Sequence, residues 1–152
     1  MSCTSGIQDE YRVASTEYRV SDVSYLAMAK HYKDLIAWQK AMDLVQAIYD
    51  ATDEFPKREV YSLTDQIRRA AVSIPSNITE GQAHFSNKEF LHFLRHSRGS
   101  LAEVETQVLI AQRRKYLLDD QATELLKRAD ELSRILSGLI NSLREKERQI
   151  GT

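Results

Sequence analysis

Apolar residues recur every three or four positions from Lys33 onward, which is the spacing of side chains that share one face of an α-helix. The first stripe predicts a helix that begins at about Lys33. This helix is expected to end near Phe55-Pro56, because a proline disfavours the helical conformation of the residue before it. Its predicted core stripe is Leu35, Trp38, Met42, Val45 and Tyr49.

A second helix is predicted from about Ser62, where Ser62-Leu63-Thr64-Asp65 is typical of a capping signal. Pro75 lies inside this helix. Since proline lacks a backbone N–H and clashes with the carbonyl four residues earlier, we expect a kink near residues 71–75 and an end at Gly81. The predicted core stripe is Leu63, Ile67, Ala70, Ile74 and Ile78.

Two longer helices follow. Ser86 is expected to cap the third, with Glu89 completing a capping box and Phe85 and Phe90 forming a hydrophobic staple. Its predicted core stripe is Phe90, Leu94, Ser97, Leu101, Val104, Val108 and Ala111. Asp119 or Asp120 is expected to cap the fourth helix. The fourth core stripe is Ala122, Leu125, Ala129, Leu132, Leu136, Leu139 and Leu143.

These patterns predict an all-α fold, an antiparallel up-down-up-down four-helix bundle over residues 31–148, with its second helix kinked at Pro75. The scarcity of turn residues, with five Gly and two Pro, agrees with a helical protein. Residues 1–30 lack a sustained period and are expected to form a poorly ordered extension, and residues 149–152 a tail. Within the extension a Glu-Tyr-Arg-Val unit occurs twice, which suggests a translated leader with the natural start at Met28; the single cysteine, Cys3, is interpreted as incidental.

The chain as a whole is nearly neutral, but its charged residues are distributed unevenly along the sequence. The chain has 21 basic and 22 acidic residues, yet residues 55–116 hold ten Lys or Arg against six Asp or Glu. Such asymmetry favours a localised surface for an anionic partner. No apolar run is long enough to span a bilayer and the N-terminus lacks the pattern of a secretory signal, so a cytoplasmic protein without a membrane partner is expected.

Basic residues at two places are the candidate nucleic-acid contacts. In an up-down bundle the first connection and the end of the third helix lie at the same pole, which predicts a cluster; the alternative is a set of solvated helix ends. The outer side of the third helix adds a second group. The candidates are Lys57, Arg58, Arg68, Lys88, His92, Arg95, Arg113, Arg114 and Lys115. Without interleaved aromatic residues, contacts are expected mainly to phosphates.

The outer face of the third helix also carries small residues. A glycine in a helix interior costs roughly 1 kcal/mol relative to alanine, so Gly99 indicates a close backbone approach. We expect Gly99, Ala102 and Thr106 to contact another subunit; the alternative is an intramolecular contact with the second helix.

Several polar residues are expected to have structural roles around Pro75. Asn77 and Glu80 follow the proline and are expected to satisfy freed backbone groups, or to pair with Arg69 or Arg98. Arg68 and Arg69 project about 100° apart, so at most one of them lies on a shared outer face, and the other is a candidate partner for Glu80 or Glu103.

Catalytic patterns are weak, so the chain is not expected to be an enzyme. His92 and His96 are four residues apart, and Glu89 precedes His92 in the Glu-x-x-His form found in di-iron bundles. Those sites need two such motifs and two further glutamates, however, and His92 is predicted to face away from the core. No cofactor, metal site or catalytic residue is therefore expected; an enzyme stays a minor alternative.

Two segments resemble the four-helix-bundle family of 23S rRNA intervening-sequence proteins, over residues 32 to about 144. They are the run from Gln66 to Gly81 and the run Ser97-Arg98-Gly99-Ser100-Leu101-Ala102-Glu103, supported by residues 35–41 and 55–59. The motif positions are Arg69, Pro75, Asn77, Glu80, Gly81, Arg98 and Glu103. Thr79 departs from the alanine usual in the motif.

One relative in this bacterial family is the accessory variability protein of diversity-generating retroelements, a pentameric barrel that binds nucleic acid and a reverse transcriptase. The resemblance therefore implies a homo-pentamer that binds RNA or DNA without catalysis. The alternative is a protein-interaction scaffold or an accessory subunit, for example of a reverse transcriptase.

Overall fold

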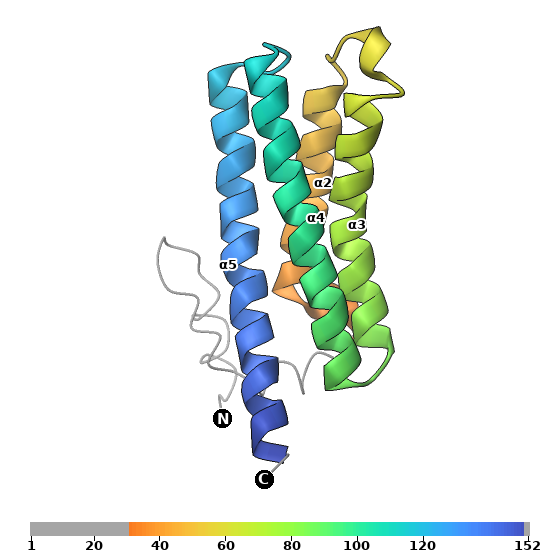
Figure 1. Cartoon of the computed structure of the whole chain (residues 1–152), viewed down its shortest axis with the longest axis vertical. Coiled ribbons are helices and arrows are strands. Elements are labelled where there is room, and N and C mark those ends of the chain that lie inside the picture. The colour runs from red at the N-terminus through yellow and green to blue at the C-terminus, as the bar shows by residue number, and fades with distance from the viewer. Residues whose placement is uncertain (1–30, 151–152) are drawn as a thin grey trace, which may run out of the picture.

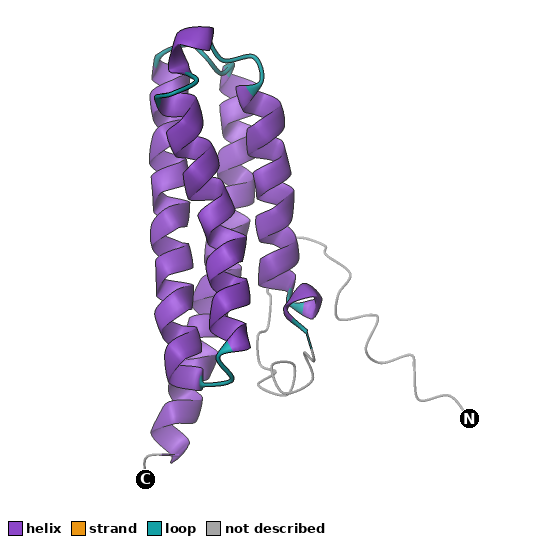
Figure 2. Cartoon of the chain, turned by 90° about the vertical axis from the view of Figure 1, so that its right-hand side faces the viewer, coloured by secondary structure: helices purple, strands orange, loops and turns teal. Residues whose placement is uncertain are grey.

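The computed structural model describes residues 31–150, and the helical elements follow the predicted order. Its α-helices are α2 (Ile36–Thr52), α3 (Leu63–Ala83), α4 (Asn87–Arg113) and α5 (Asp119–Ile150), with short 3-10 helices η1 (Tyr32–Asp34) and η2 (Lys57–Glu59). No strand occurs in residues 31–150 (Figure 2), so the predicted all-α class is confirmed. The predictions for residues 1–30, including those for Cys3 and Met28, lie outside the described residues.

The four α-helices run alternately up and down, which confirms the predicted bundle (Figure 1). Each packs against its neighbours in chain order, and α5 closes the bundle against α2. The α2–α3 and α4–α5 connections lie at one end, here called the two-connection end (Figures 1 and 2). The α3–α4 connection lies at the opposite, one-connection end, beyond which α5 extends. Helix α5 reaches Ile150, two residues into the predicted tail.

Three of the four predicted core stripes are buried as expected. Every predicted position of α3, α4 and α5 is buried, from Leu63 to Ile78, from Phe90 to Ala111 and from Ala122 to Leu143. Leucine, isoleucine and valine fill most of these positions, and their burial supplies the hydrophobic free energy that holds the helices together.

The predicted stripe of α2 is only partly right, because the buried face lies about a quarter turn away. Leu35 is buried, and Trp38 and Val45 are partly buried against the core, but Met42 and Tyr49 are 42% and 39% exposed. The fully buried positions of the helix are Ala37, Ala41, Leu44, Ile48 and Thr52. Both sets follow the same steps of three and four, and the prediction chose the bulkier one. The two alanines let α2 approach its neighbours closely. The Arg68 guanidinium lies 4.6 Å from the Tyr49 ring centroid and covers part of this exposed ring.

Two predicted helix starts differ from the structure in detail. Ser62 makes no side-chain cap of α3; instead the Glu59 carboxylate accepts a hydrogen bond from the Leu63 amide at 3.3 Å. Ser86 does cap α4, since its hydroxyl accepts from the Glu89 amide at 3.5 Å. The predicted staple is wrong, because Phe85 is 95% exposed while Phe90 is buried. A positive φ of 52° at Phe85 belongs to the left-handed turn that ends α3.

Helix α3 continues through Pro75 to Ala83, two residues beyond the predicted end. The kink expected at Pro75 stays a prediction. Asn77 donates a hydrogen bond to the Ser73 carbonyl at 2.8 Å, so its side chain bonds the backbone of its own helix, although the carbonyl that Pro75 leaves without its usual partner is that of Ala71. The buried Ser97 hydroxyl of α4 donates to the carbonyl of Ile74, the residue before the proline, at 2.9 Å. These bonds tie α4 to the proline turn of α3.

Gly81 is the second motif residue with a clear packing role. A Cβ atom at Gly81 would lie 2.7 Å from the Phe93 Cβ and 2.9 Å from the Phe90 Cδ2. Such distances are too short for carbon atoms, so any side chain there forces α3 away from α4. Glycine is therefore required where these helices converge at the one-connection end.

Candidate functional site

Basic residues gather around one tyrosine at the two-connection end. The Tyr116 hydroxyl donates a hydrogen bond to Glu59 Oε1 at 2.9 Å and accepts one from Arg58 Nη2 at 3.3 Å. The Arg58 and Arg114 guanidinium groups lie 5.8 Å and 5.7 Å from the Tyr116 ring centroid. We call Arg58, Glu59, Arg114 and Tyr116 the Tyr116 cluster. It joins the two connections, which are far apart in sequence.

The end of α4 places Tyr116 in this cluster. The Lys115 amide donates to the Gln112 carbonyl and the Tyr116 amide to the Ala111 carbonyl, both at 2.9 Å, which is the Schellman arrangement. It requires a left-handed residue, and Lys115 supplies it with a φ of 60°. Glycine takes this position in most proteins. A lysine here costs on the order of 1 kcal/mol, so the sequence keeps a cation where glycine would be more stable.

Hydrogen bonding within the cluster perturbs two of its charged groups. The pKa of Glu59 is lowered from its ordinary value of 4.5, chiefly because the Tyr116 hydroxyl and then the Leu63 amide donate to the carboxylate. The pKa of Arg114 is raised, chiefly by its interaction with Tyr116. Both shifts favour the charged forms, so the cluster holds two guanidinium cations and one carboxylate at neutral pH.

Carboxylates balance the charge of this end. Lys57, Arg58, Arg113, Arg114 and Lys115 are all exposed, and the contacts with Tyr116 bring Arg58 and Arg114 together, whereas the cluster of all five stays a prediction. The same two connections and the first turn of α5 carry Asp53, Glu54, Glu59, Asp119 and Asp120. Two of these acids have partners, since Asp53 pairs with Arg68 at 2.9 Å and Asp119 accepts from Gln112 at 3.1 Å. With Arg68 counted beside its partner Asp53, six cations face five carboxylates, so the end is rich in cations but close to neutral overall.

The other predicted basic contacts lie elsewhere. Lys88, His92 and Arg95 are exposed near the start of α4, towards the one-connection end. From His92 to Arg114 the helix rises about 33 Å at 1.5 Å per residue. The nine predicted residues therefore do not form one surface.

The predicted roles of Arg68 and Arg69 are reversed. Arg68 is held by α2, because its Nε donates to Thr52 Oγ1 at 2.8 Å and its Nη2 pairs with Asp53. Arg69 is the exposed member, with 79% of its side chain accessible, and pairs with Asp65 at 2.9 Å. The expected pairing of Arg69 with Glu80 or Glu103 is wrong. Arg68 had been expected to contact nucleic acid, but these bonds occupy it on the bundle.

Glu80 and Arg98 also lack the expected pairings. Both are exposed, and within residues 31–150 neither forms an ion pair. Their place in the family motif has no explanation in the contacts of a single chain.

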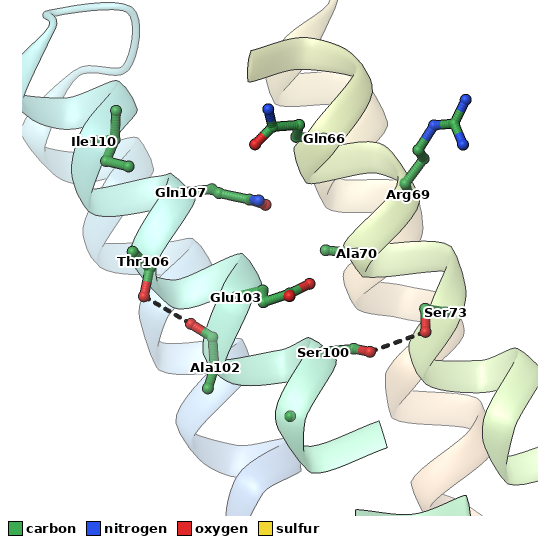
Figure 3. Close-up of a pocket in the computed structure, with 11 residues that line it drawn as sticks. Gln66, Arg69, Ala70, Ser73, Ser100, Ala102, Glu103, Thr106, Gln107 and Ile110 are labelled. Carbon is green, nitrogen blue, oxygen red and sulfur yellow. Dashed lines mark hydrogen bonds between the residues drawn. The ribbon is translucent and has the colours of Figure 1, made fainter. Parts of the chain in front are cut away.

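A groove between α3 and α4 contains the predicted interface residues. Its volume is about 700 Å³, and it is open to solvent (Figure 3). Gly99, Ala102 and Thr106 line its α4 side, and Arg69 and Ser73 line its α3 side. A Cβ atom at Gly99 would meet nothing within 4 Å. The intramolecular alternative for Gly99 is therefore wrong, since no contact within the described residues requires a glycine there.

Polar groups in this groove are incompletely satisfied. Gln107 Oε1 is buried without a hydrogen-bond partner in the described part of the chain. Figure 3 shows Glu103 and Gln107 extending from α4 towards α3. Across the groove floor, the Ser73 and Ser100 hydroxyls are hydrogen bonded at 2.9 Å, and Asn77 donates to Ser73 Oγ. These hydrogen-bonded polar side chains distinguish the groove from the apolar core of the bundle.

Two further predictions concern metals and membranes. Among residues 31–150, no three histidine, cysteine or acidic residues are grouped to hold a metal ion. No described helix combines the length and apolar character needed to cross a bilayer.

Sequence reasoning missed two aromatic residues. Tyr116 directly follows the basic run Arg113-Arg114-Lys115, so the sequence places it beside basic residues. Only the Schellman turn shows that its ring lies between two arginines. Phe85 was assigned to the interior and is exposed. The expectation that no aromatic residue interleaves the basic residues is corrected by Tyr116.

Comparison with known proteins agrees with this architecture. Residues 33–138 match the family model described as 23S rRNA-intervening sequence protein. No curated protein matches the chain. The fold is similar to the crystal structure of a protein of unknown function from the S23 ribosomal protein family of Bacteroides thetaiotaomicron, with a TM-score of 0.65 and 20% identity, over 70% of this chain and 96% of that one. Since the family model covers more than half of the sequence, this chain belongs to the family of 23S rRNA-intervening sequence proteins.

Proposed function

We propose that this protein is a non-enzymatic, self-assembling cytoplasmic protein that binds nucleic acid through phosphate contacts at its two-connection end. The observation that carries the proposal is the convergence of Arg58 and Arg114 on Tyr116, beside a lysine held at a positive φ. Membership in a family of rRNA-intervening sequence proteins supports it.

Phosphates fit this site better than bases do. Arginine donors stack on aromatic rings and bind phosphate oxygens through a planar fork. Two guanidinium groups lie near the Tyr116 ring, which leaves it little room to stack on a base. Arg58 gives one donor to the Tyr116 hydroxyl, and each guanidinium has five N–H donors in all. The contacts would therefore be largely independent of sequence.

Self-assembly would supply the affinity that one chain lacks. The two-connection end is close to neutral overall, so each copy is expected to neutralise only a few phosphates. If Arg58, Arg114 and Lys115 each neutralise one, the slope of log K against log salt is about −2.7 per copy. A ring of copies would present several such ends to one nucleic acid and multiply the effect.

The α3–α4 groove is the proposed contact between copies. Gly99 costs roughly 1 kcal/mol in helix propensity and no internal contact explains it. A helix of a second copy could approach the backbone closely there. The family resemblance suggests five copies.

Binding is tested by titrating a structured RNA and a DNA duplex with the protein at several KCl concentrations. We expect salt-sensitive binding that weakens at least tenfold in the Arg58→Ala, Arg114→Ala double variant. Arg134→Ala is the matched control, because it removes an exposed arginine of α5 that pairs with Asp130. Equal affinity of all three proteins, or no binding at low salt, would contradict the proposal.

Assembly is tested by light scattering on the Gly99→Leu variant. Since the space around Gly99 is empty in the single chain, the variant should fold normally, and circular dichroism checks this. We expect the assembly to dissociate. Ser76→Leu, which adds similar bulk to an exposed position of α3 outside the groove, should leave it intact. A Gly99→Leu protein with the wild-type mass would place the contact elsewhere.

Phe85 favours a second candidate function, a protein-interaction scaffold. A phenylalanine that is 95% exposed and has a positive φ is unfavourable in both hydration and backbone conformation. As an accessory subunit, for example of a reverse transcriptase, the protein would cover this ring with its partner. Salt-tolerant co-purification with a reverse transcriptase that is lost in Phe85→Ser would support this alternative over nucleic-acid binding.

A further inference from the structure

Two histidines of α4 lie side by side outside the Tyr116 cluster and the α3–α4 groove. The Nε2 atoms of His92 and His96 are hydrogen-bonded to each other at 3.1 Å, and their ring centroids are 4.6 Å apart at an angle of 79°. Both residues are exposed. Their spacing of four residues places them on one face of a regular helix, one turn apart. The helix thus fixes the separation of two nitrogen ligands.

This separation fits a shared metal ion. A transition metal binds imidazole nitrogen at about 2.0–2.1 Å. Two such bonds at angles between square and tetrahedral place the nitrogens roughly 2.9–3.4 Å apart. The observed 3.1 Å falls in this range. In the observed hydrogen bond only one Nε2 offers its lone pair, so an ion would replace the shared proton and would need both rings to turn about Cβ–Cγ, a torsion with broad preferences.

Neighbouring aromatic contacts restrict the pair. Phe93 stands between the two histidines in the sequence. Its ring centroid lies 5.5 Å from that of His92 and 6.4 Å from that of His96. His84 of the α3–α4 turn stacks on Phe93, with ring centroids 5.3 Å apart, and within the described residues it makes no ring contact with the pair itself. The contacts of Phe93 with the two imidazoles reduce the conformational freedom that they lose on binding an ion.

We propose that His92 and His96 form a two-ligand surface site for a divalent transition metal ion that prefers imidazole, with water at the remaining positions. Copper, nickel and zinc are the candidates, in the order Cu²⁺ > Ni²⁺ or Zn²⁺, whereas Mg²⁺ and Ca²⁺ prefer oxygen ligands. The described residues offer no third protein ligand, which makes the site exchangeable rather than structural. This inference does not depend on nucleic-acid binding.

The site has a defined place relative to the α3–α4 groove. Positions 92, 96, 99 and 103 follow one another in steps of four, three and four, so the histidine pair continues the face of α4 that carries Gly99 and Glu103. An ion on this pair therefore lies one turn beyond the end of the groove.

The test is isothermal titration of the untagged full chain with NiCl₂ and ZnCl₂. A Cys3→Ser background removes the only thiol. We expect one ion per chain, bound at least tenfold more tightly than by His92→Ala or His96→Ala. His84→Ala is the matched control, because it removes a histidine of the same aromatic group and leaves the pair intact. It should bind like the parent.

Electron paramagnetic resonance of the Cu²⁺ complex provides a second readout. Two coordinated imidazole nitrogens are expected in the parent and in His84→Ala, and at most one in either single variant of the pair. Unchanged nickel and zinc affinity in both His92→Ala and His96→Ala would overturn the proposal. Loss of the site in His84→Ala would also overturn it, because the ligands would then not be the proposed pair.

Discussion

Single residues at special backbone positions distinguish this bundle from a generic one. Gly81 and Gly99 are both helical glycines of the family motif, yet only Gly81 is needed by the packing of the single chain. Lys115 and Phe85 occupy left-handed positions where glycine is favoured. Gly81 is thus explained by the fold, whereas the other three residues carry a cost that the fold does not explain.

The two glycines give a paired prediction. Gly81→Ala should lower the free energy of unfolding by roughly 1–2 kcal/mol, because the clash with Phe93 and Phe90 outweighs the gain in helix propensity. Gly99→Ala should raise it by up to about 1 kcal/mol, since its Cβ meets nothing. Urea unfolding at matched protein concentration and assembly state measures both. A stabilised Gly81→Ala protein would show that the α3–α4 contact is looser than described, and a destabilised Gly99→Ala protein would show that the space around Gly99 is filled.

Lys115 gives a second prediction at this scale. Lys115→Gly should stabilise the fold by about 0.5–1 kcal/mol, because glycine adopts a φ of 60° without steric cost. The same variant should weaken nucleic-acid binding. Lys115→Asn, which also tolerates this conformation, separates the loss of charge from the gain in backbone freedom. Thermal unfolding and the RNA titration provide the two readouts; a destabilised Lys115→Gly protein would argue against the backbone cost.

Elements of secondary structure follow from the sequence wherever one apolar stripe stands alone. In α3, α4 and α5 the apolar positions form a single stripe, and all predicted core residues are buried. In α2, a stripe of alanine, leucine and isoleucine runs beside one of tryptophan, methionine, valine and tyrosine. Periodicity cannot choose between them, because the choice depends on how closely α3 and α5 approach.

The candidate site was predictable only in part, for a similar reason. The apolar stripes and short connections predict an up-down bundle, and this topology places Arg58 and Arg114 at the same end. The bonds of Arg68 to Thr52 and Asp53 depend on how the end of α2 is oriented, which no local pattern encodes. The α3 cap is a similar case, because Glu59 reaches Leu63 from a separate 3-10 helix.

Glu59 links the start of α3 to the end of α4, which predicts a pH dependence. Its pKa is lowered below 4.5 in the folded state, so the unfolded chain binds more protons between the two values. The stability that Glu59 contributes is therefore complete above pH 4.5 and is lost as the pH falls through the folded pKa.

Denaturant unfolding from pH 7 to pH 3 tests this. Glu59→Gln should be less stable than the parent at pH 7, and the difference should shrink below pH 4.5. Glu54→Gln, which removes a carboxylate from the same connection without affecting Tyr116 or Leu63, serves as the control. A constant difference over the whole range would show that the charge of Glu59 does not matter.

At the scale of the whole molecule, the proposed nucleic-acid binding would be coupled to the proposed assembly. One chain offers a nearly neutral end with a few well-placed cations, so its affinity for a polyanion should be low. If copies assemble through the α3–α4 groove, their two-connection ends face the same side of a closed ring. Binding strength would then depend on a surface far from the basic residues.

This coupling predicts that Gly99→Leu weakens RNA binding at least a hundredfold, although it changes no charge, because the linked copies act as one multivalent ligand. Affinity measured across the concentration range in which light scattering detects dissociation tests this. Single chains that bind RNA as tightly as the assembly would contradict this prediction, because the cations of one copy would then account for the whole affinity.

The extension of α5 beyond the one-connection end has a practical consequence. A tether or fluorophore attached at the end of α5 lies at the opposite end of the bundle from the two-connection end (Figure 1). Protein immobilised on a sensor surface through this helix would point its arginines into the flowing solution. The same attachment would place a fluorophore nearer to the histidine pair, so the binding of a quenching ion such as Cu²⁺ could be measured as a loss of fluorescence.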